Sequence, residues 1–189
     1  MILGISAATF TLMHVLLSLI GIFAGAVVLS AIIDGRLLGG WNAVFLVTTI
    51  ATSVTGFLFH SSFGPPHAIG VISLVVLAIA VVALYGRQLA GFWRASYAAA
   101  AVLALYLNVF VGVVRAFQKL PFLESLAPTQ SEPPFLAAQS AVLVAFVIFG
   151  FLAVRRFRLP GSNPGPLPQP VTPLRCAERR IKIAAGQHA

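Results

Sequence analysis

LMHVLLSLIGIFAGAVVLSAII, residues 12–33, is the stretch that decides how the rest of the chain is interpreted. It contains no Asp, Glu, Lys or Arg, and it is long enough to cross a bilayer, for which a helix needs about 20 residues. A signal peptide would begin with basic residues and have a shorter apolar core of about 7 to 15 residues. We therefore expect this stretch to be a membrane-spanning helix that the protein retains.

Four more apolar blocks of similar length follow, at about residues 41–60, 67–86, 95–114 and 134–154. None alternates between apolar and polar residues as a strand of an outer-membrane barrel would, and an open sheet cannot satisfy its backbone in lipid. Only 8% of the 189 residues are charged and 59% are hydrophobic, whereas soluble domains carry about a quarter charged residues. The sequence thus predicts an all-α integral membrane bundle of five transmembrane helices, with consecutive helices antiparallel.

The basic residues indicate how the five helices are oriented. Five spans put the chain ends on opposite faces, and ten of the twelve Lys and Arg residues then share the C-terminal face. Positive residues concentrate in cytoplasmic loops, so the predicted topology is N-out and C-in. The ten are Arg36, Arg87, Arg94, Arg155, Arg156, Arg158, Arg175, Arg179, Arg180 and Lys182, while Arg115 and Lys119 remain on the outer face.

This topology also explains the net charge of +8 more simply than nucleic-acid binding does. The basic residues lie in loops and a tail rather than on one folded face, so we expect no nucleic-acid partner. Arg155, Arg156 and Arg158 would instead attract anionic lipid headgroups, at about 1 kcal/mol per basic residue. Membrane lipids are the expected partners of this end of the chain.

Composition changes sharply after Phe157. Residues 159–189 contain half of the twelve prolines and a basic stretch, and such a segment buries too little apolar surface to offset its ordering entropy. We predict two regions, a five-span bundle at residues 1–158 and a disordered, Pro-rich, basic cytoplasmic tail at residues 159–189. The only cysteine, Cys176, lies in the tail, which excludes an intrachain disulfide.

Residues with chemical activity are scarce in the predicted spans. The four acidic residues, Asp34, Glu124, Glu132 and Glu178, all lie outside the apolar blocks, which argues against a proton relay built on embedded carboxylates. The sequence contains no phosphate-binding loop and no nucleophile elbow. These features favour a protein that is not an enzyme, since any catalytic acid or base in the membrane would have to be a histidine.

The histidines outside the tail are all predicted at the outer ends of spans, level with Arg115. Stripes of small and polar residues at helical spacing mark the sides of membrane helices that face other helices, and Gly21 and Gly25 form a step that permits close approach. Three such stripes end at or begin with these residues. They are His14, Ser18, Gly21 and Gly25; Thr49, Ser53, Gly56 and His60; and Ala101, Ala104, Asn108, Gly112 and Arg115.

Two interpretations of these outer-face polar residues stay open. In one, they have only a structural role, at the membrane interface and at a turn of residues 64–66. In the other, they form one outer-face site: neutral imidazoles suit zinc, copper or iron, and two facing each other could hold a single haem. The candidate residues for cofactor binding are His14, His60, His67, Asn108 and Arg115, and those for a metal are His14, His60 and His67.

Three segments are similar to those of a family of small bacterial membrane proteins: TSVTGF (residues 52–57), LALYLNVFV (residues 103–111) and LAPTQSEPPF (residues 126–135). The resemblance covers about residues 12–157. It implies a multi-pass, five-helix protein of the bacterial inner (plasma) membrane. The family is uncharacterised, so the resemblance implies no activity and no functional residue is carried over from it.

Taken together, these patterns predict a non-enzymatic binding or accessory subunit of the inner membrane, with other membrane proteins or further copies of itself as partners. A metal- or haem-binding redox subunit is the alternative. A small transporter is the third hypothesis, but many transporters use internal repeats and broken helices. The sequence shows neither an internal repeat nor a Gly-Pro interruption within a span.

Overall fold

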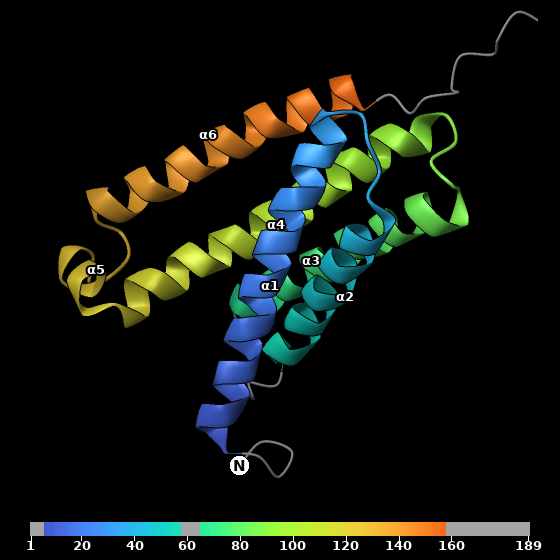
Figure 1. Cartoon of the computed structure of the whole chain (residues 1–189). Helices are drawn as coiled ribbons and strands as arrows, with labels where there is room; N and C mark the ends of the chain where they lie inside the picture. Colours follow the sequence, from blue (N-terminus) through green and yellow to red (C-terminus); the bar gives the residue numbers. More distant parts are fainter. Residues whose placement is uncertain (1–5, 58–64, 158–189) are drawn as a thin grey trace, which may run out of the picture. The chain divides into compact units, whose positions relative to one another are not determined.

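The computed structural model describes residues 6–57 and 65–157, and within them the chain forms helices and turns but no strand (Figure 1). The segment 58–64 and the predicted tail lie outside the described residues. The helices are α1 (Ala7–Ile33), α2 (Gly39–Gly56), α3 (Pro65–Val81) with its π-helical continuation η2 (Val82–Gly86), α4 (Phe92–Lys119), α5 (Pro121–Leu126) and α6 (Pro133–Arg156).

Four of the helical segments are long and apolar enough to cross a membrane: Ala8–Ile33, His67–Gly86, Phe92–Lys119 and Pro133–Arg156. The predicted all-helical class is therefore confirmed, and four of the predicted spans have helices of the required length and apolarity. The remaining one, predicted at residues 41–60, contains α2, which ends at Gly56 and is not among these four segments.

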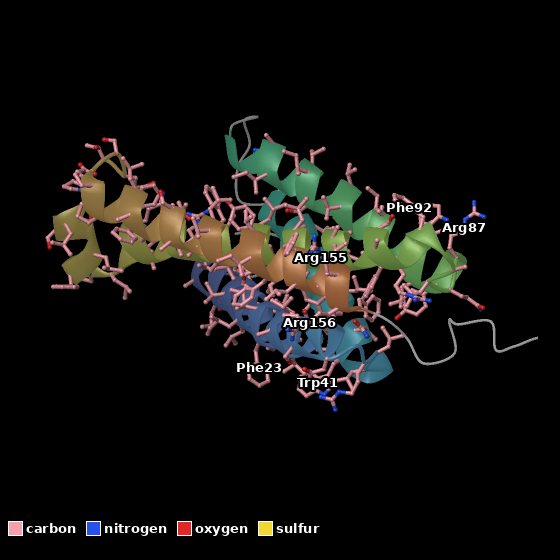
Figure 2. The ribbon with its side chains drawn as sticks, turned by 90° about the horizontal axis from the view of Figure 1, so that it is seen from above. Phe23, Trp41, Arg87, Phe92, Arg155 and Arg156 are labelled. Carbon is pink, nitrogen blue, oxygen red and sulfur yellow. The ribbon has the colours of Figure 1, made fainter. Side chains whose placement is uncertain are left out.

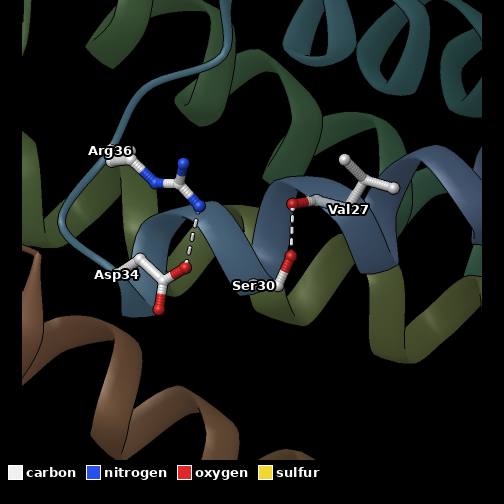
Figure 3. A network of polar contacts seen from close by, with 4 residues as sticks. All are labelled: Val27, Ser30, Asp34 and Arg36. Atoms are coloured by element: carbon white, nitrogen blue, oxygen red, sulfur yellow. Dashed lines mark hydrogen bonds and ion pairs between the residues drawn. The ribbon is translucent and has the colours of Figure 1, made fainter.

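The end of α1 is fixed by a glycine. Gly35 has a φ of 72°, in the left-handed region that glycine adopts without strain. Its N–H donates to the carbonyl of Ile32 at 3.0 Å, and the N–H of Arg36 donates to that of Ala31 at 2.8 Å. This bond pair is the Schellman motif, which satisfies the last carbonyls of a helix and turns the chain toward α2. Figure 3 shows the exposed ion pair beside it, with 3.0 Å between Arg36 Nη2 and Asp34 Oδ2.

Most of the other helices pack against α4. It contacts α1, α3, α5 and α6, and Figure 1 shows α6 running beside it in the opposite direction. The core contains Tyr97 and Leu105 from α4, together with Phe45 from α2 and Leu77 from α3, all almost completely buried. The most buried part of the protein therefore lies where the first four helices meet.

Two glycines let α1 approach its neighbours closely. A Cβ atom at Gly25 would lie 2.5 Å from Leu105 Cδ1 and 2.8 Å from Phe45 Cε2, so the side chains of α4 and α2 occupy the space that a methyl group would need. At Gly21, a Cβ atom would lie 3.1 Å from Asn108 Nδ2. The close approach predicted from the Gly21 and Gly25 step is confirmed.

A buried polar pair also joins α2 to α4. The hydroxyl of Tyr97 donates a hydrogen bond to Asn42 Oδ1, and Asn42 Nδ2 donates to the carbonyl of Leu38 at 2.9 Å. Tyr97 and Asn42 are both almost completely buried. Because an unpartnered polar group is costly in such a place, the pair fixes the position of α2 along α4.

The surface of the helices is apolar where that of a soluble protein would be polar. Phe23 is 63% exposed and lies edge-on to Trp41, with 5.9 Å between ring centroids, and Figure 2 shows both at the outside of the bundle. In α6, no residue of the most apolar stretch is buried. Lipid chains can cover such a surface without the free-energy cost of hydrating it.

Candidate functional site

A cavity of about 370 Å³ lies among α1, α2, α3 and α4. This volume falls within the range of about 300 to 1,000 Å³ that is usual for small-molecule sites. The N-terminal halves of α1 and α3 and the C-terminal halves of α2 and α4 form it, so it lies toward one end of these helices. The lining residues are His14, Thr49, Thr52, Ser53, Gly56, Phe57, His67, Ile69, Gly70, Ser73, Ala104, Leu107, Asn108, Phe110, Val111, Val114, Arg115, Gln118 and Gln130.

Several polar side chains of the lining are deeply buried. Thr49 is 2% exposed and Asn108 is 8% exposed, and their hydrogen bonds therefore decide whether burying them is favourable. Three helices supply this buried polar lining, so it is not a property of one amphipathic segment. The members that are more than nine-tenths buried are Thr49 and Thr52 of α2, His67 and Ser73 of α3, and Asn108 of α4.

The deepest polar groups are only partly satisfied. Ser18 Oγ donates to Asn108 Oδ1 at 3.0 Å, which orients the amide across the α1–α4 contact. Asn108 Nδ2 and Thr49 Oγ1 are buried and have no hydrogen-bond partner among the residues that the structure describes. On the α1 side of these two atoms stands Gly21, which has no side chain to offer them. Two residues that line the cavity therefore carry buried hydrogen-bonding atoms that the protein does not use within its described part.

His14 is held by α2. Its Nδ1 atom lies 2.9 Å from Thr55 Oγ1, and Thr55 Oγ1 in turn donates to the carbonyl of Ala51 at 2.7 Å. This contact between α1 and α2 holds the His14 ring where it borders the cavity.

His67 reaches the cavity from the first turn of α3. Its side chain is buried, and its ring packs against that of Phe57, with 5.5 Å between the ring centroids. Gly70, one turn later, leaves room for the same phenylalanine, since a Cβ atom there would lie 3.0 Å from Phe57 Cζ. Both aromatic rings thereby become part of the cavity wall.

The rim of the cavity is polar and includes a residue from the turn before α6. Arg115 is exposed, and its Nη1 donates to Gln118 Oε1 at 3.3 Å. Gln130, with a φ of 58°, sits in the turn that Glu132 organises by accepting from the Thr129 N–H at 3.1 Å and the Thr129 hydroxyl at 2.8 Å. Desolvation opposes ionisation of Glu132, but these hydrogen bonds outweigh it and hold the pKa of its carboxyl below the ordinary value.

The cavity favours negative charge. Its titratable lining groups are His14, His67 and Arg115, and no Asp or Glu of the described chain lines it. Within residues 6–57 and 65–157, the only ion pair is that of Asp34 with Arg36, so Arg115 has no carboxylate partner there. A guanidinium without a counter-charge at the edge of an apolar bundle attracts anions.

Four of the five residues that sequence analysis singled out line this one cavity: His14, His67, Asn108 and Arg115. The fifth, His60, lies outside the described residues. Among the described residues, no group of three or more His, Cys, Asp or Glu side chains could hold a metal ion. The predicted three-histidine metal site depends on His60 and stays a prediction, as does a single haem.

Two polar lining residues, Ser73 and Gln130, illustrate what the sequence patterns do not reveal. Ser73 follows His67 and Gly70 at a spacing of three, so the three residues form a stripe like those recognised on the other helices. Gln130 left no comparable signal, because it reaches the rim through a turn rather than through helical periodicity. Thr49 and Thr52 are both buried and both line the cavity.

Comparison of the chain with protein-family models, with curated proteins and with solved structures finds no match. The resemblance to small bacterial inner-membrane proteins therefore stays a prediction.

Proposed function

We propose that the chain is a multi-pass membrane protein whose cavity binds a small polar molecule, so that it serves as a non-enzymatic binding or accessory subunit. The observation that carries this proposal is the buried polar lining contributed by α2, α3 and α4 around one cavity. In a membrane bundle, polar groups away from water are costly and commonly mark functional sites. An occupant that hydrogen-bonds to Asn108 and Thr49 would offset that cost.

An organic molecule suits the lining better than a metal ion does. Most of the polar lining groups are hydroxyls, amides and a guanidinium, which hydrogen-bond to organic ligands and bind transition metals poorly. Phe57, Ile69 and Val111 add an apolar wall of the kind that surrounds most small-molecule sites. The metal- or haem-binding redox subunit remains the alternative, and it would use His14, His60 and His67.

Blocking the cavity sterically tests the proposal without removing any polar group. Gly56 lines the cavity, and among the described residues a Cβ atom there would meet only His14 Cε1, at 3.8 Å, so Gly56→Leu should project into the open space. Gly40→Leu is the matched control on the same helix, since no atom of a described residue lies within 4 Å of its Cβ position. We expect native mass spectrometry to find a bound small molecule on wild-type protein and on Gly40→Leu, at occupancy about tenfold or more lower on Gly56→Leu.

Metal analysis and an absorption spectrum of the same samples separate the alternatives. A stoichiometric metal or a haem band that disappears in Gly56→Leu would favour the redox subunit. An occupant that persists in Gly56→Leu would lie elsewhere on the protein, and wild-type protein without any occupant would leave the cavity without the ligand that we propose. Either of these last results would refute the binding function.

We also propose that α2 completes a fifth span and that the chain lies N-out and C-in in a bacterial inner membrane. The positive-inside rule supports this orientation. With Cys176 replaced by serine, single cysteines introduced by Arg36→Cys and Ser62→Cys would flank this span, and Lys119→Cys would mark the outer face. A membrane-impermeant maleimide applied to intact cells should label Ser62→Cys and Lys119→Cys, and should label Arg36→Cys only after permeabilisation. Labelling of Arg36→Cys and Ser62→Cys from the same side would exclude the fifth span.

A further inference from the structure

We infer that the cavity takes an amphipathic anion that carries a hydrogen-bond acceptor at the end opposite its charge, such as a medium-chain carboxylate with an ester or keto oxygen. The inference rests on the proposed function, because it names the class of molecule that the same cavity would bind. Three features carry it: a cationic rim, a buried pair of hydrogen-bonding atoms, and an apolar wall between them.

The rim supplies the charge selectivity. Arg115 lines the cavity, and its side-chain hydrogen bond within the described part of the chain goes to the neutral amide of Gln118, at a long 3.3 Å. A guanidinium binds carboxylate or phosphate oxygens through two parallel N–H donors, and such charge-assisted bonds are about twice as strong as neutral ones. Lys119, one helical turn further along, does not line the cavity. The two residues carry the same charge, so Arg115 differs from Lys119 in its position at the cavity.

The buried end of the cavity supplies the second contact. Asn108 Nδ2 can only donate, and Thr49 Oγ1 carries a hydroxyl proton; neither atom has a partner within the described part of the chain. The bond from Ser18 to Asn108 Oδ1 leaves the donor side of the amide for another group. A Cβ atom at Gly21 would lie 3.1 Å from Asn108 Nδ2 and 3.2 Å from Thr49 Oγ1, so both donors border the same small space. One carbonyl oxygen, which has two lone pairs, could accept from both.

The distance between the two contacts sets the size of the ligand. Asn108 and Arg115 are seven residues apart on α4, which corresponds to about 10 Å along the helix axis. Between them, Val111 and Val114 line the cavity from the same helix, and Phe57 and Ile69 face it from α2 and α3. A ligand that reaches both contacts must therefore have an apolar middle section.

Lipid headgroups and water offer a simpler explanation of the same polar residues. Arg115 could extend toward lipid phosphates at the membrane surface, and water could satisfy Asn108 and Thr49. Under that explanation Arg115 and Lys119 would be equivalent, and removing the Thr49 hydroxyl would affect no ligand. Matched substitutions at these positions therefore distinguish a ligand site from polar residues that contact only lipid headgroups and water.

The test is calorimetric titration of the full-length protein in maltoside micelles, with protein-free micelles as the blank. The probes are monomethyl sebacate, which has a carboxylate and a distant ester, decanoate, which lacks the ester, and decyltrimethylammonium, which is cationic. The variants form two matched pairs. Arg115→Gln is compared with Lys119→Gln, which removes the same charge nearby, and Thr49→Val is compared with Thr48→Val, which lies outside the lining on the same helix.

Wild-type protein should bind monomethyl sebacate about 3- to 10-fold more tightly than decanoate, because of the added neutral hydrogen bond, and should bind the cation least. Arg115→Gln should weaken both anions about 10- to 100-fold, whereas Lys119→Gln should change them by less than about 3-fold. Thr49→Val should abolish the preference for the ester while folding is retained, since the lost hydroxyl has no described partner, and Thr48→Val should keep the preference.

Equal effects of Arg115→Gln and Lys119→Gln, or an ester preference that survives Thr49→Val, would overturn the inference. If the Gly56→Leu block removes a bound molecule but the cationic probe binds as well as the anions, the proposed binding function stands and the ligand class is wrong. If no molecule is bound in either experiment, both are wrong. If phosphatidylglycerol competes with monomethyl sebacate for wild-type protein but not for Arg115→Gln, the natural ligand is a membrane lipid. If it does not compete, the natural ligand is a soluble acid.

Discussion

Gly25→Ala is expected to destabilise the bundle by about 1 to 3 kcal/mol, the usual cost of adding a methylene-sized group to a well-packed core. The new Cβ atom would lie 2.5 Å from Leu105 Cδ1 and 2.8 Å from Phe45 Cε2, far inside normal contact distance. Leu105 and Phe45 are themselves almost completely buried, so neither can move aside without disturbing α3 or the α1–α4 contact. Denaturant-induced unfolding in mixed micelles measures the change.

Gly112→Ala is the matched control. Gly112 is also within a helix, but a Cβ atom there would lie 3.7 Å from Ile22 Cδ1, an ordinary contact. Both substitutions gain the same helix propensity, up to about 1 kcal/mol, so their difference isolates the steric term. If Gly25→Ala unfolds no more easily than Gly112→Ala, then α1 does not approach α4 and α2 as closely as described.

The Gly21 and Gly25 step was predictable because it depends on local spacing alone. Two small residues four apart on an apolar helix indicate a close contact whatever the partner is. The same reasoning placed Thr49 and Asn108 on inward-facing sides, and both are buried. Helical periodicity therefore predicted which sides of α1, α2 and α4 meet other helices, but it could not predict which side chains would meet.

Predicting the cavity would have required knowing which side chains of different helices meet. Asn108 is bonded by Ser18 at 3.0 Å, and Gly21 stands beside its amide, yet these residues are far apart in the sequence. Nothing in the local sequence specifies that α1 lies between α2 and α4 at this level. Gln130 is a stronger example, since it reaches the rim through a turn held by the carboxylate of Glu132. The sequence marked candidate residues, and tertiary packing decided which of them share a space.

α2 lies within the predicted fifth span, but it is less apolar than the four helices that could cross a membrane by length and composition. α2 contains Gly39, Gly40, Asn42 and several threonines, which lower its apolar character, and it is not among the helices that are apolar enough to span by composition alone. Thr48, Thr52 and Thr55 donate hydrogen bonds to carbonyls of their own helix, as Thr52 does to the carbonyl of Thr48 at 2.8 Å, so these three threonines expose less polarity than the composition of α2 suggests. Asn42 is likewise compensated, through its bond with Tyr97.

Tyr97→Phe tests that compensation directly, and it is expected to destabilise the protein by about 1 to 3 kcal/mol, the cost of leaving a buried polar atom unpaired. The phenylalanine ring would retain its packing against Phe157, now with 6.1 Å between ring centroids, so lost apolar contact contributes little. What disappears is the donor to Asn42 Oδ1, an atom buried in the core of the bundle. Unfolding in mixed micelles again measures the effect.

Tyr106→Phe is the control for this change, because the Tyr106 hydroxyl makes no hydrogen bond with any described residue although its ring also packs in an aromatic group, 5.7 Å from that of Phe146. It should alter the free energy of unfolding by no more than about 0.5 kcal/mol. Combining Tyr97→Phe with Asn42→Leu removes both partners, so the double variant should be less destabilised than the sum of the single variants, by about 0.5 to 3 kcal/mol. Additive effects, or a Tyr97→Phe protein as stable as Tyr106→Phe, would mean that the pair does not join α2 to α4.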